Sequence, residues 1–167
     1  MDLQLTRRGD YTVRAAVALA KAGPGGGYRK LREIAEEMSI PLRYTHEIVS
    51  LLVKAGLAEA LAGKQGGYRL VRSATDITLL EVVEAGEGAL RMDRCALSGG
   101  PCHWQHTICA VHPMLEDATK ALTASMRGQT LADVLAMDHK LASQARPAPG
   151  ARKLPPQAIP TSDEDEG

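Results

Sequence analysis

The sequence contains very few aromatic residues. Its 167 residues include four tyrosines, one tryptophan and no phenylalanine, so aromatic side chains make up 3% of the chain. A core of this composition must be built from Leu, Val, Ile, Ala and Met, which favours packed helices over a β-sandwich. Hydrophobic residues still make up 44% of the chain. That share can form a real core and excludes a fully disordered protein.

The sequence also lacks long hydrophobic runs and a net charge. No apolar run approaches the ~18–20 residues that span a bilayer, and the start, Met1–Gln4, shows no secretory signal. We therefore expect a cytoplasmic protein with no membrane partner. The net charge is zero, but residues 1–75 carry +5 and residues 76–167 carry −5. A basic first half suits nucleic-acid binding, because cations that neutralise phosphates release counterions; a chance imbalance between solvated surfaces is the alternative.

Three helical patterns with short connections fill most of the first half. The first runs from about Thr6 to Ala22 and stops at the glycine-rich segment 23–27. A short amphipathic helix follows over residues 31–38, and a third helix begins at Pro41, a residue suited to the first helical position. Two helices joined by so short a turn are typical of a helix-turn-helix, although many helical hairpins bind nothing.

A glycine-rich hairpin comes directly after the third helix. Residues 57–61 alternate between apolar and polar, residues 63–67 form a turn that carries Lys64, and residues 68–71 complete a second strand. A helix-turn-helix followed by such a hairpin is the winged-helix arrangement. We predict a mainly α fold: a winged helix-turn-helix over residues 1–75, with a small β-hairpin wing and a C-terminal dimerisation helix.

The second half is predicted to join the winged domain to a second copy of the chain. Thr78 and Glu81 form a capping box that opens a linking helix within residues 76–91. The helix that begins at Pro113 has a narrow apolar stripe that nothing later in the chain looks able to cover. We therefore expect a two-fold dimer through residues 113–142, with folding onto the winged domain as the alternative. Residues 143–167 form a Pro-rich, acidic tail that is predicted to be disordered.

Three cysteines lie in one loop, residues 92–112. Cys95, Cys102 and Cys109 follow a C-x6-C-x6-C spacing, without the close cysteine pairs of most structural zinc sites. An evenly spaced triplet of thiols can reach separate corners of an iron–sulfur cluster. A zinc site, a thiol redox switch and no function remain the alternatives. Candidates for the fourth ligand of a cluster are His103, His106, His112 and a carboxylate from elsewhere.

Six motifs, taken in order, resemble those of the Rrf2 family of bacterial regulators. The resemblance implies a homodimeric winged-helix regulator of palindromic DNA operators. In this family, three cysteines after the wing mark the cluster-binding branch, which implies one [2Fe-2S] or [4Fe-4S] cluster per subunit held by Cys95, Cys102 and Cys109. The likeness covers about residues 3–140 and its motifs are Leu5–Arg14, Glu33–Glu36, Ile40–Tyr44, Lys54–Leu57, Gly66–Leu70 and Ile77–Val83.

The resemblance implies two solutions for the fourth cluster ligand. His112 matches the Cys-x-x-His arrangement of some cluster-binding members, and Asp10 matches a first-helix carboxylate that nitric-oxide-sensing members donate from the partner subunit. We expect His112, because it is close to Cys109 in the sequence, with Asp10 as the alternative. The cysteine spacing is wider than usual in the family, so the type of cluster does not transfer. Ala62 stands where relatives often carry a wing arginine, which Lys64 or Arg69 would replace.

The predicted DNA contacts fall into two groups. Side chains near the start of the third helix are expected to meet the major groove, where an arginine can hold guanine through two hydrogen bonds. Other cations are expected to contact phosphates, which position a protein without reading sequence. The first group is Arg43, Tyr44, Thr45 and His46; the second is Arg7, Arg8, Lys54 and Lys64.

The predicted function is transcriptional regulation, most simply repression. Operator affinity would be switched by an iron–sulfur cluster that senses redox state, nitric oxide or iron supply. The alternative is a cluster-free member that acts as a thiol-based or zinc-containing regulator. We expect no enzymatic activity and no small-molecule substrate, because the sequence has no Cys-x-x-Cys pair, no nucleotide-binding glycine motif and no clustered acid–base set.

Overall fold

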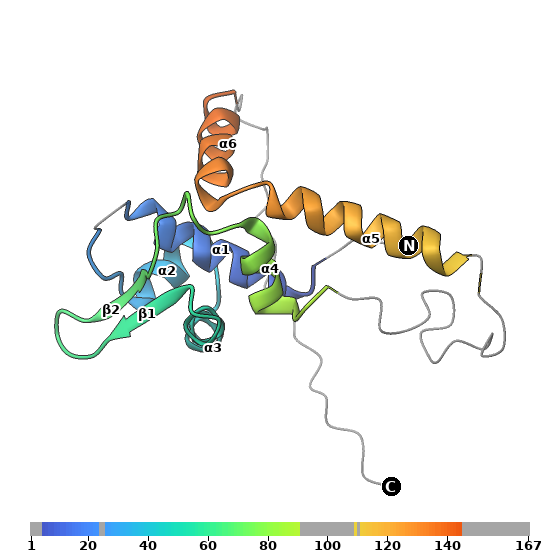
Figure 1. Ribbon diagram of the computed structural model, residues 1–167. Helices are drawn as coiled ribbons and strands as arrows, with labels where there is room; N and C mark the ends of the chain where they lie inside the picture. Colours follow the sequence, from blue (N-terminus) through green and yellow to red (C-terminus); the bar gives the residue numbers. More distant parts are fainter. Residues whose placement is uncertain (1–4, 24–25, 91–108, 110, 145–167) are drawn as a thin grey trace, which may run out of the picture.

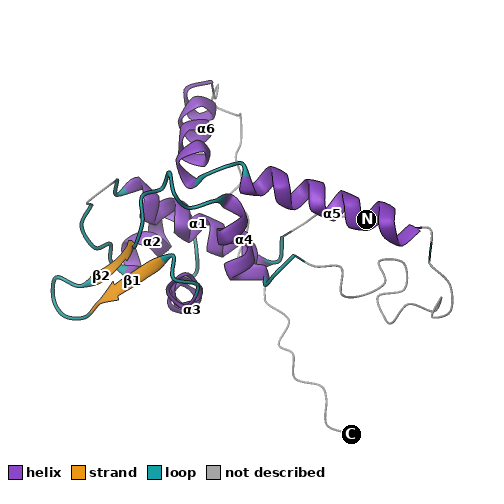
Figure 2. Cartoon of the chain, viewed as in Figure 1, coloured by secondary structure: helices purple, strands orange, loops and turns teal. Residues whose placement is uncertain are grey.

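The computed structural model describes residues 5–23, 26–90, 109 and 111–144. Among these residues no helix is both long and apolar enough to cross a membrane. The mainly helical chain with one small antiparallel hairpin confirms the predicted winged-helix fold (Figures 1 and 2). In chain order the elements are α1 (Arg7–Lys21), α2 (Leu31–Met38), α3 (Leu42–Lys54), β1 (Ala58–Leu61), β2 (Gly67–Leu70), α4 (Leu79–Glu87), α5 (Val111–Arg127) and α6 (Leu131–Gln144).

Polar caps set the starts of several helices. The Thr78 hydroxyl accepts a hydrogen bond from the Glu81 amide, and the Glu81 carboxylate accepts one from the Thr78 amide, as the capping-box pattern predicts. Thr130 and Asp133 repeat this arrangement at α6. Helix α5 begins two residues before Pro113. The proline is tolerated there because the first amides of a helix have no intrahelical partner.

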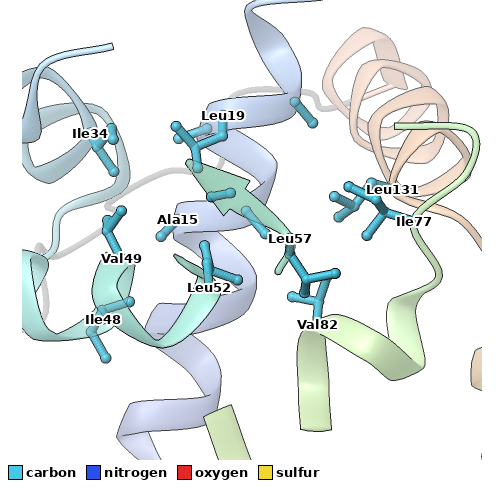
Figure 3. Close-up of a cluster of buried hydrophobic side chains, with 14 of the residues drawn as sticks. Ala15, Leu19, Ile34, Ile48, Val49, Leu52, Leu57, Ile77, Val82 and Leu131 are labelled. Carbon is cyan, nitrogen blue, oxygen red and sulfur yellow. The ribbon is translucent and has the colours of Figure 1, made fainter. Parts of the chain in front are cut away.

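Helix α1 is the centre of the core. Ala15, Ala16 and Ala18 are fully buried, and α2, α3, α4, α6 and β2 all pack against this helix. Small side chains let neighbouring backbones approach closely, and larger residues from those neighbours fill the space around them. Figure 3 shows this cluster, with Leu19 from α1 among side chains from four other helices and the adjoining loops.

A tight turn orients α3 against α2. Ser39 adopts a left-handed conformation, φ 54°, and the Ile40 amide donates to the Ala35 carbonyl at 2.9 Å. Ile40 is buried, and Pro41 serves as the residue that caps α3 rather than as its first helical residue. Because the turn is short and its Ile40 side chain is buried in the core, the two helices are fixed as one helix-turn-helix unit.

The wing is attached to this unit along one edge. Strands β1 and β2 pair in an antiparallel register that sets Ala58 opposite Leu70. Arg29, just before α2, forms an isolated antiparallel bridge with Tyr68. The hairpin is therefore paired on its outer edge to the segment that leads into α2, and its base is fixed relative to the helix-turn-helix.

Helices α5 and α6 differ in how they relate to the core. Leu131, the first residue of α6, is fully buried, and its amide donates to the Ile77 carbonyl at 2.9 Å. No described residue of α5 is buried, although α5 packs against α4. Figure 1 shows α5 running away from the body formed by α1–α4. The side chains of α5 are therefore all at least partly exposed, whereas the first residue of α6 is buried in the core of the winged domain.

The first turn of α1 and the last turn of α4 meet at two glycines. A Cβ atom at position 86 would lie 2.9 Å from the Gly9 Cα and 2.9 Å from the Thr12 Oγ1. Two hydrogen bonds stabilise the contact. The Arg8 Nε donates to the Gly86 carbonyl at 2.7 Å, and the Thr6 amide donates to the Glu87 carboxylate at 2.6 Å. Only glycine at position 86 permits this approach.

We expect Gly86→Ala to destabilise the fold by about 1–3 kcal/mol, the usual cost of overpacking a tight contact. Urea unfolding followed by circular dichroism measures the change. Gly27→Ala is the matched control, because a Cβ there meets nothing within 4 Å and the smaller freedom of the unfolded chain predicts a gain of at most ~1 kcal/mol. Equal stability of the two variants would contradict the tight packing of α1 on α4.

Candidate nucleic-acid interface

Helix α3 has one face in the core and one in solvent. Ile48, Val49 and Leu52 are buried with the packing side of the helix. The solvent face is polar and mostly cationic or neutral, with one carboxylate, Glu47. Its exposed members are Arg43, His46, Glu47 and Lys54.

Arg43 lies over the ring of its neighbour Tyr44. The guanidinium carbon is 4.7 Å from the ring centroid, and Tyr44 is half-buried. A cation over a tyrosine face is attracted by the ring quadrupole. The guanidinium is exposed yet oriented, which suits a side chain that must meet a partner at a defined angle.

The prediction that Thr45 meets the major groove is wrong. Thr45 is fully buried, and its hydroxyl donates to the Pro41 carbonyl at 3.2 Å. The physical reason is helical periodicity: Thr45 precedes Ile48 by three positions and Val49 by four, so it lies on the apolar face. That spacing was a signal in the sequence, and it outweighs the closeness of Thr45 to Arg43 along the chain.

On the wing, Arg69 is bound within the hairpin. Its Nε donates to Glu59 at 2.6 Å, and its guanidinium lies 4.6 Å from the centroid of the Tyr28 ring. The Tyr28 hydroxyl donates to the same carboxylate oxygen at 2.8 Å. Hydrogen bonds from Arg69 and from Tyr28 hold the pKa of Glu59 below its usual value. Lys64 is exposed at the turn, whereas the guanidinium of Arg69 is already bound to Glu59.

Lys30 is a residue that the sequence reasoning missed. Its Nζ donates to the carbonyls of Lys64 and Gly66 in the wing turn. Lys30 precedes α2 and is 34 positions from Lys64. No local motif marks it; only the pairing of Arg29 with Tyr68 brings it to the wing.

The other predicted phosphate contacts lie at helix ends. Lys54 is exposed in the last turn of α3, and Arg7 and Arg8 begin α1. Arg8 is exposed but uses its Nε to bind the Gly86 carbonyl. These positions are compatible with cations that touch a backbone without reading bases.

Only part of the predicted cluster site is described. Cys95 and Cys102 lie outside the described residues. Cys109 is half-buried just before α5, and the His112 amide donates to the Cys109 carbonyl at 3.1 Å, so the two residues share one turn. Asp10 binds Arg14 through two contacts of 3.0 Å. Within the described part of the chain, no three His, Cys, Asp or Glu side chains are placed to hold a metal ion.

A solvent-facing helix in a helix-turn-helix, with a paired hairpin beside it, defines the class of winged-helix DNA-binding proteins. The family model Rrf2, described as an iron-dependent transcriptional regulator, matches residues 5–137. The chain belongs to the Rrf2 family, and its members are transcriptional regulators rather than enzymes, as predicted. A comparison with curated protein sequences gave no match.

Solved structures agree with this assignment. IscR of T. potens is 29% identical, with a TM-score of 0.67 over 87% of this chain and 95% of that one. CymR (YrzC), the global cysteine regulator of B. subtilis, is 24% identical, with a TM-score of 0.66 over 87% of this chain and 100% of that one; this likeness concerns the fold alone. CymR of Staphylococcus aureus is 25% identical, with a TM-score of 0.60 over 77% and 95%.

Proposed function

We propose that this regulator binds a palindromic operator as a homodimer, with the exposed face of α3 in the major groove and the wing turn on the adjacent backbone. The observation that carries the proposal is the placement of Arg43 and His46 on the solvent face of α3, in a unit whose wing exposes Lys64. Family membership supports a role in transcription. Repression, with the helices blocking a promoter, is the simplest outcome of such binding.

Within this interface, the residues that we expect to contact base edges are Arg43, His46 and Tyr44. The Arg43 fork can donate two hydrogen bonds to guanine. Glu47 lies on the same face, where its charge repels phosphate but can accept a hydrogen bond from a cytosine amine. The candidates for phosphate contacts are Arg7, Arg8, Lys54 and Lys64.

Arg43→Ala and Lys54→Ala are expected to affect DNA binding differently. After an operator is selected from random duplexes, Arg43→Ala should lose about 1–3 kcal/mol of discrimination at one base position per half-site. Lys54→Ala should weaken all sequences alike and lower the salt slope by about 1. Titrations at several salt concentrations measure both. Lys140→Ala, an exposed cation on α6, is the control and should change neither; a selection that enriches no sequence would contradict base reading.

We also propose that α5 forms the dimer. Its apolar side chains recur at helical spacing on one face, and Val111 and Met114 are exposed, at 39% and 72%. A two-fold axis lets such a face cover itself with its own copy. The stripe consists of Val111, Met114, Leu115, Ala118, Leu122 and Met126.

Leu122→Glu is expected to dissociate the dimer. A charge in the centre of an apolar interface costs about 2 kcal/mol or more, so the dimer dissociation constant should rise at least about thirtyfold. Analytical ultracentrifugation measures it. Ala124→Glu adds the same charge on the opposite, exposed side of α5 and should leave the dimer intact. Identical sedimentation of the two variants would place the interface elsewhere.

For the signal, we propose an iron–sulfur cluster held by Cys95, Cys102, Cys109 and His112. Three thiolates and an imidazole are a donor set that iron accepts, and Cys109 and His112 already share one turn at the start of α5. The description of the family as iron-dependent supports iron over zinc. When bound, such a group supplies an iron centre that oxidants and nitric oxide attack. Of the proposed ligands, Cys109 and His112 would be presented from one hydrogen-bonded turn that precedes and enters α5.

Anaerobic purification tests the cluster and its fourth ligand. We expect brown protein that contains iron, with visible absorbance and a Mössbauer signal. His112→Ala should alter that spectrum or lose the iron, whereas Asp10→Ala should keep it; the reverse result makes Asp10 the ligand. His139→Ala, an exposed histidine on α6, is the matched control. Colourless wild-type protein without iron would favour the thiol-based or zinc-containing alternative, which metal analysis separates.

A further inference from the structure

The wing turn is held by a side chain from outside the hairpin. The Lys30 Nζ donates to the Lys64 carbonyl at 2.7 Å and also to the Gly66 carbonyl. Both carbonyls belong to the turn between β1 and β2 that carries the Lys64 side chain. Lys30 itself caps the start of α2. One ammonium group thus joins the wing turn to the helix-turn-helix.

The backbone of Lys30 is fixed on both sides. Arg29 and Tyr68 exchange two backbone hydrogen bonds, 2.8 and 2.9 Å, and the Lys30 amide donates to Glu33 at 3.1 Å. Gly67 makes the approach possible: its φ is +154°, and a Cβ there would lie 2.4 Å from the Arg29 carbonyl oxygen. The Lys30 side chain therefore reaches the turn from a rigid base.

The wing turn is rich in glycine, so holding it in one conformation costs backbone entropy. Residues 62–66 include two glycines, and all but Gly66 are exposed. Glycine loses more backbone entropy on folding than any other residue. The Gly66 amide donates to the Gly63 carbonyl at 3.0 Å, and the two bonds from Lys30 add a charged donor, which binds carbonyls more strongly than a neutral one. A turn ordered in advance does not have to lose that entropy when DNA binds.

We propose that Lys30 is a positioning residue of the wing: its ammonium fixes the turn in one shape, and that shape sets where Lys64 meets the DNA backbone. The second half of this statement rests on the proposed function, whereas the first half is a property of the free protein. The two halves are tested separately.

Amide hydrogen exchange tests whether the Lys30 ammonium stabilises the wing turn. Lys30→Met keeps the aliphatic stem and removes the ammonium, so the Gly66 amide should exchange at least about tenfold faster, equivalent to ~1.4 kcal/mol of local opening. Lys30→Arg restores a charged donor and should return exchange toward that of the wild type. Lys64→Met is the control: its ammonium makes no hydrogen bond within the described residues, so exchange should stay unchanged. Unaltered exchange in Lys30→Met would overturn the proposal.

A double-mutant cycle tests the link to DNA. The probe is a random-sequence duplex of about 30 base pairs at low salt, since phosphate contacts dominate such binding. Lys30→Met and Lys64→Met should each weaken binding by about tenfold, and the double variant should bind no more weakly than Lys64→Met alone. Lys140→Met removes a charge far from the wing and should bind as the wild type does.

The outcomes separate the two proposals. Additive losses would mean that Lys30 touches phosphate itself, which overturns the positioning role. If wild-type protein binds neither this duplex nor a selected operator, the proposed function fails and the DNA half fails with it. The exchange measurement then still decides whether Lys30 orders the turn.

Discussion

Close packing around α1 is the constraint on which the other functional elements depend. A row of alanines at zero exposure lets α2, α3 and α4 approach one helix together, and Gly86 lets the last turn of α4 lie against Gly9. A packed interior has few alternative arrangements, so a shift of one element must be followed by its neighbours. The start of α1, which carries two candidate phosphate contacts, is therefore tied to the end of α4, and α4 is the element that precedes the cysteine loop.

The parts of this architecture with short-range causes were predictable from the sequence. Capping boxes at Thr78 and Thr130 bind amides within three residues of themselves, and the 3.6-residue periodicity defines the buried face of each helix in the winged domain. Thr45 is close to Arg43 along the chain, but this periodicity puts it on the buried face of α3. The same periodicity gives the correct side without any coordinates, because Thr45, Ile48, Val49 and Leu52 form one continuous stripe.

The parts with long-range causes were not predictable. The sequence alone suggests that Arg69 is a free cation. In the structure it donates to Glu59 on the paired strand and lies over the ring of Tyr28, which precedes α2. Lys30 reads as the residue before a helix, yet it orders a turn in another part of the chain. Glu59 meets Arg69 through the register of the hairpin. Tyr28 and Lys30 reach the wing through the pairing of Arg29 with Tyr68, a long-range contact that no local sequence pattern marks. The contrast between α5 and α6 has the same origin, because the burial of Leu131 depends on contacts with residues far back in the chain.

His112 and Asp10, the two candidates for the fourth ligand, differ in the contacts that each side chain already makes. The Asp10 carboxylate accepts from Arg14 on the next turn of α1, and Arg14 also donates to the Met38 carbonyl at the end of α2, 3.4 Å away. Ligation by Asp10 would have to share or break this ion pair, at the small cost typical of exposed pairs. His112 is exposed, and a backbone hydrogen bond already holds it in one turn with Cys109. This shared turn supports the proposal of His112 as the fourth ligand, and an arrangement that brings the cysteine loop to α1 would instead support Asp10.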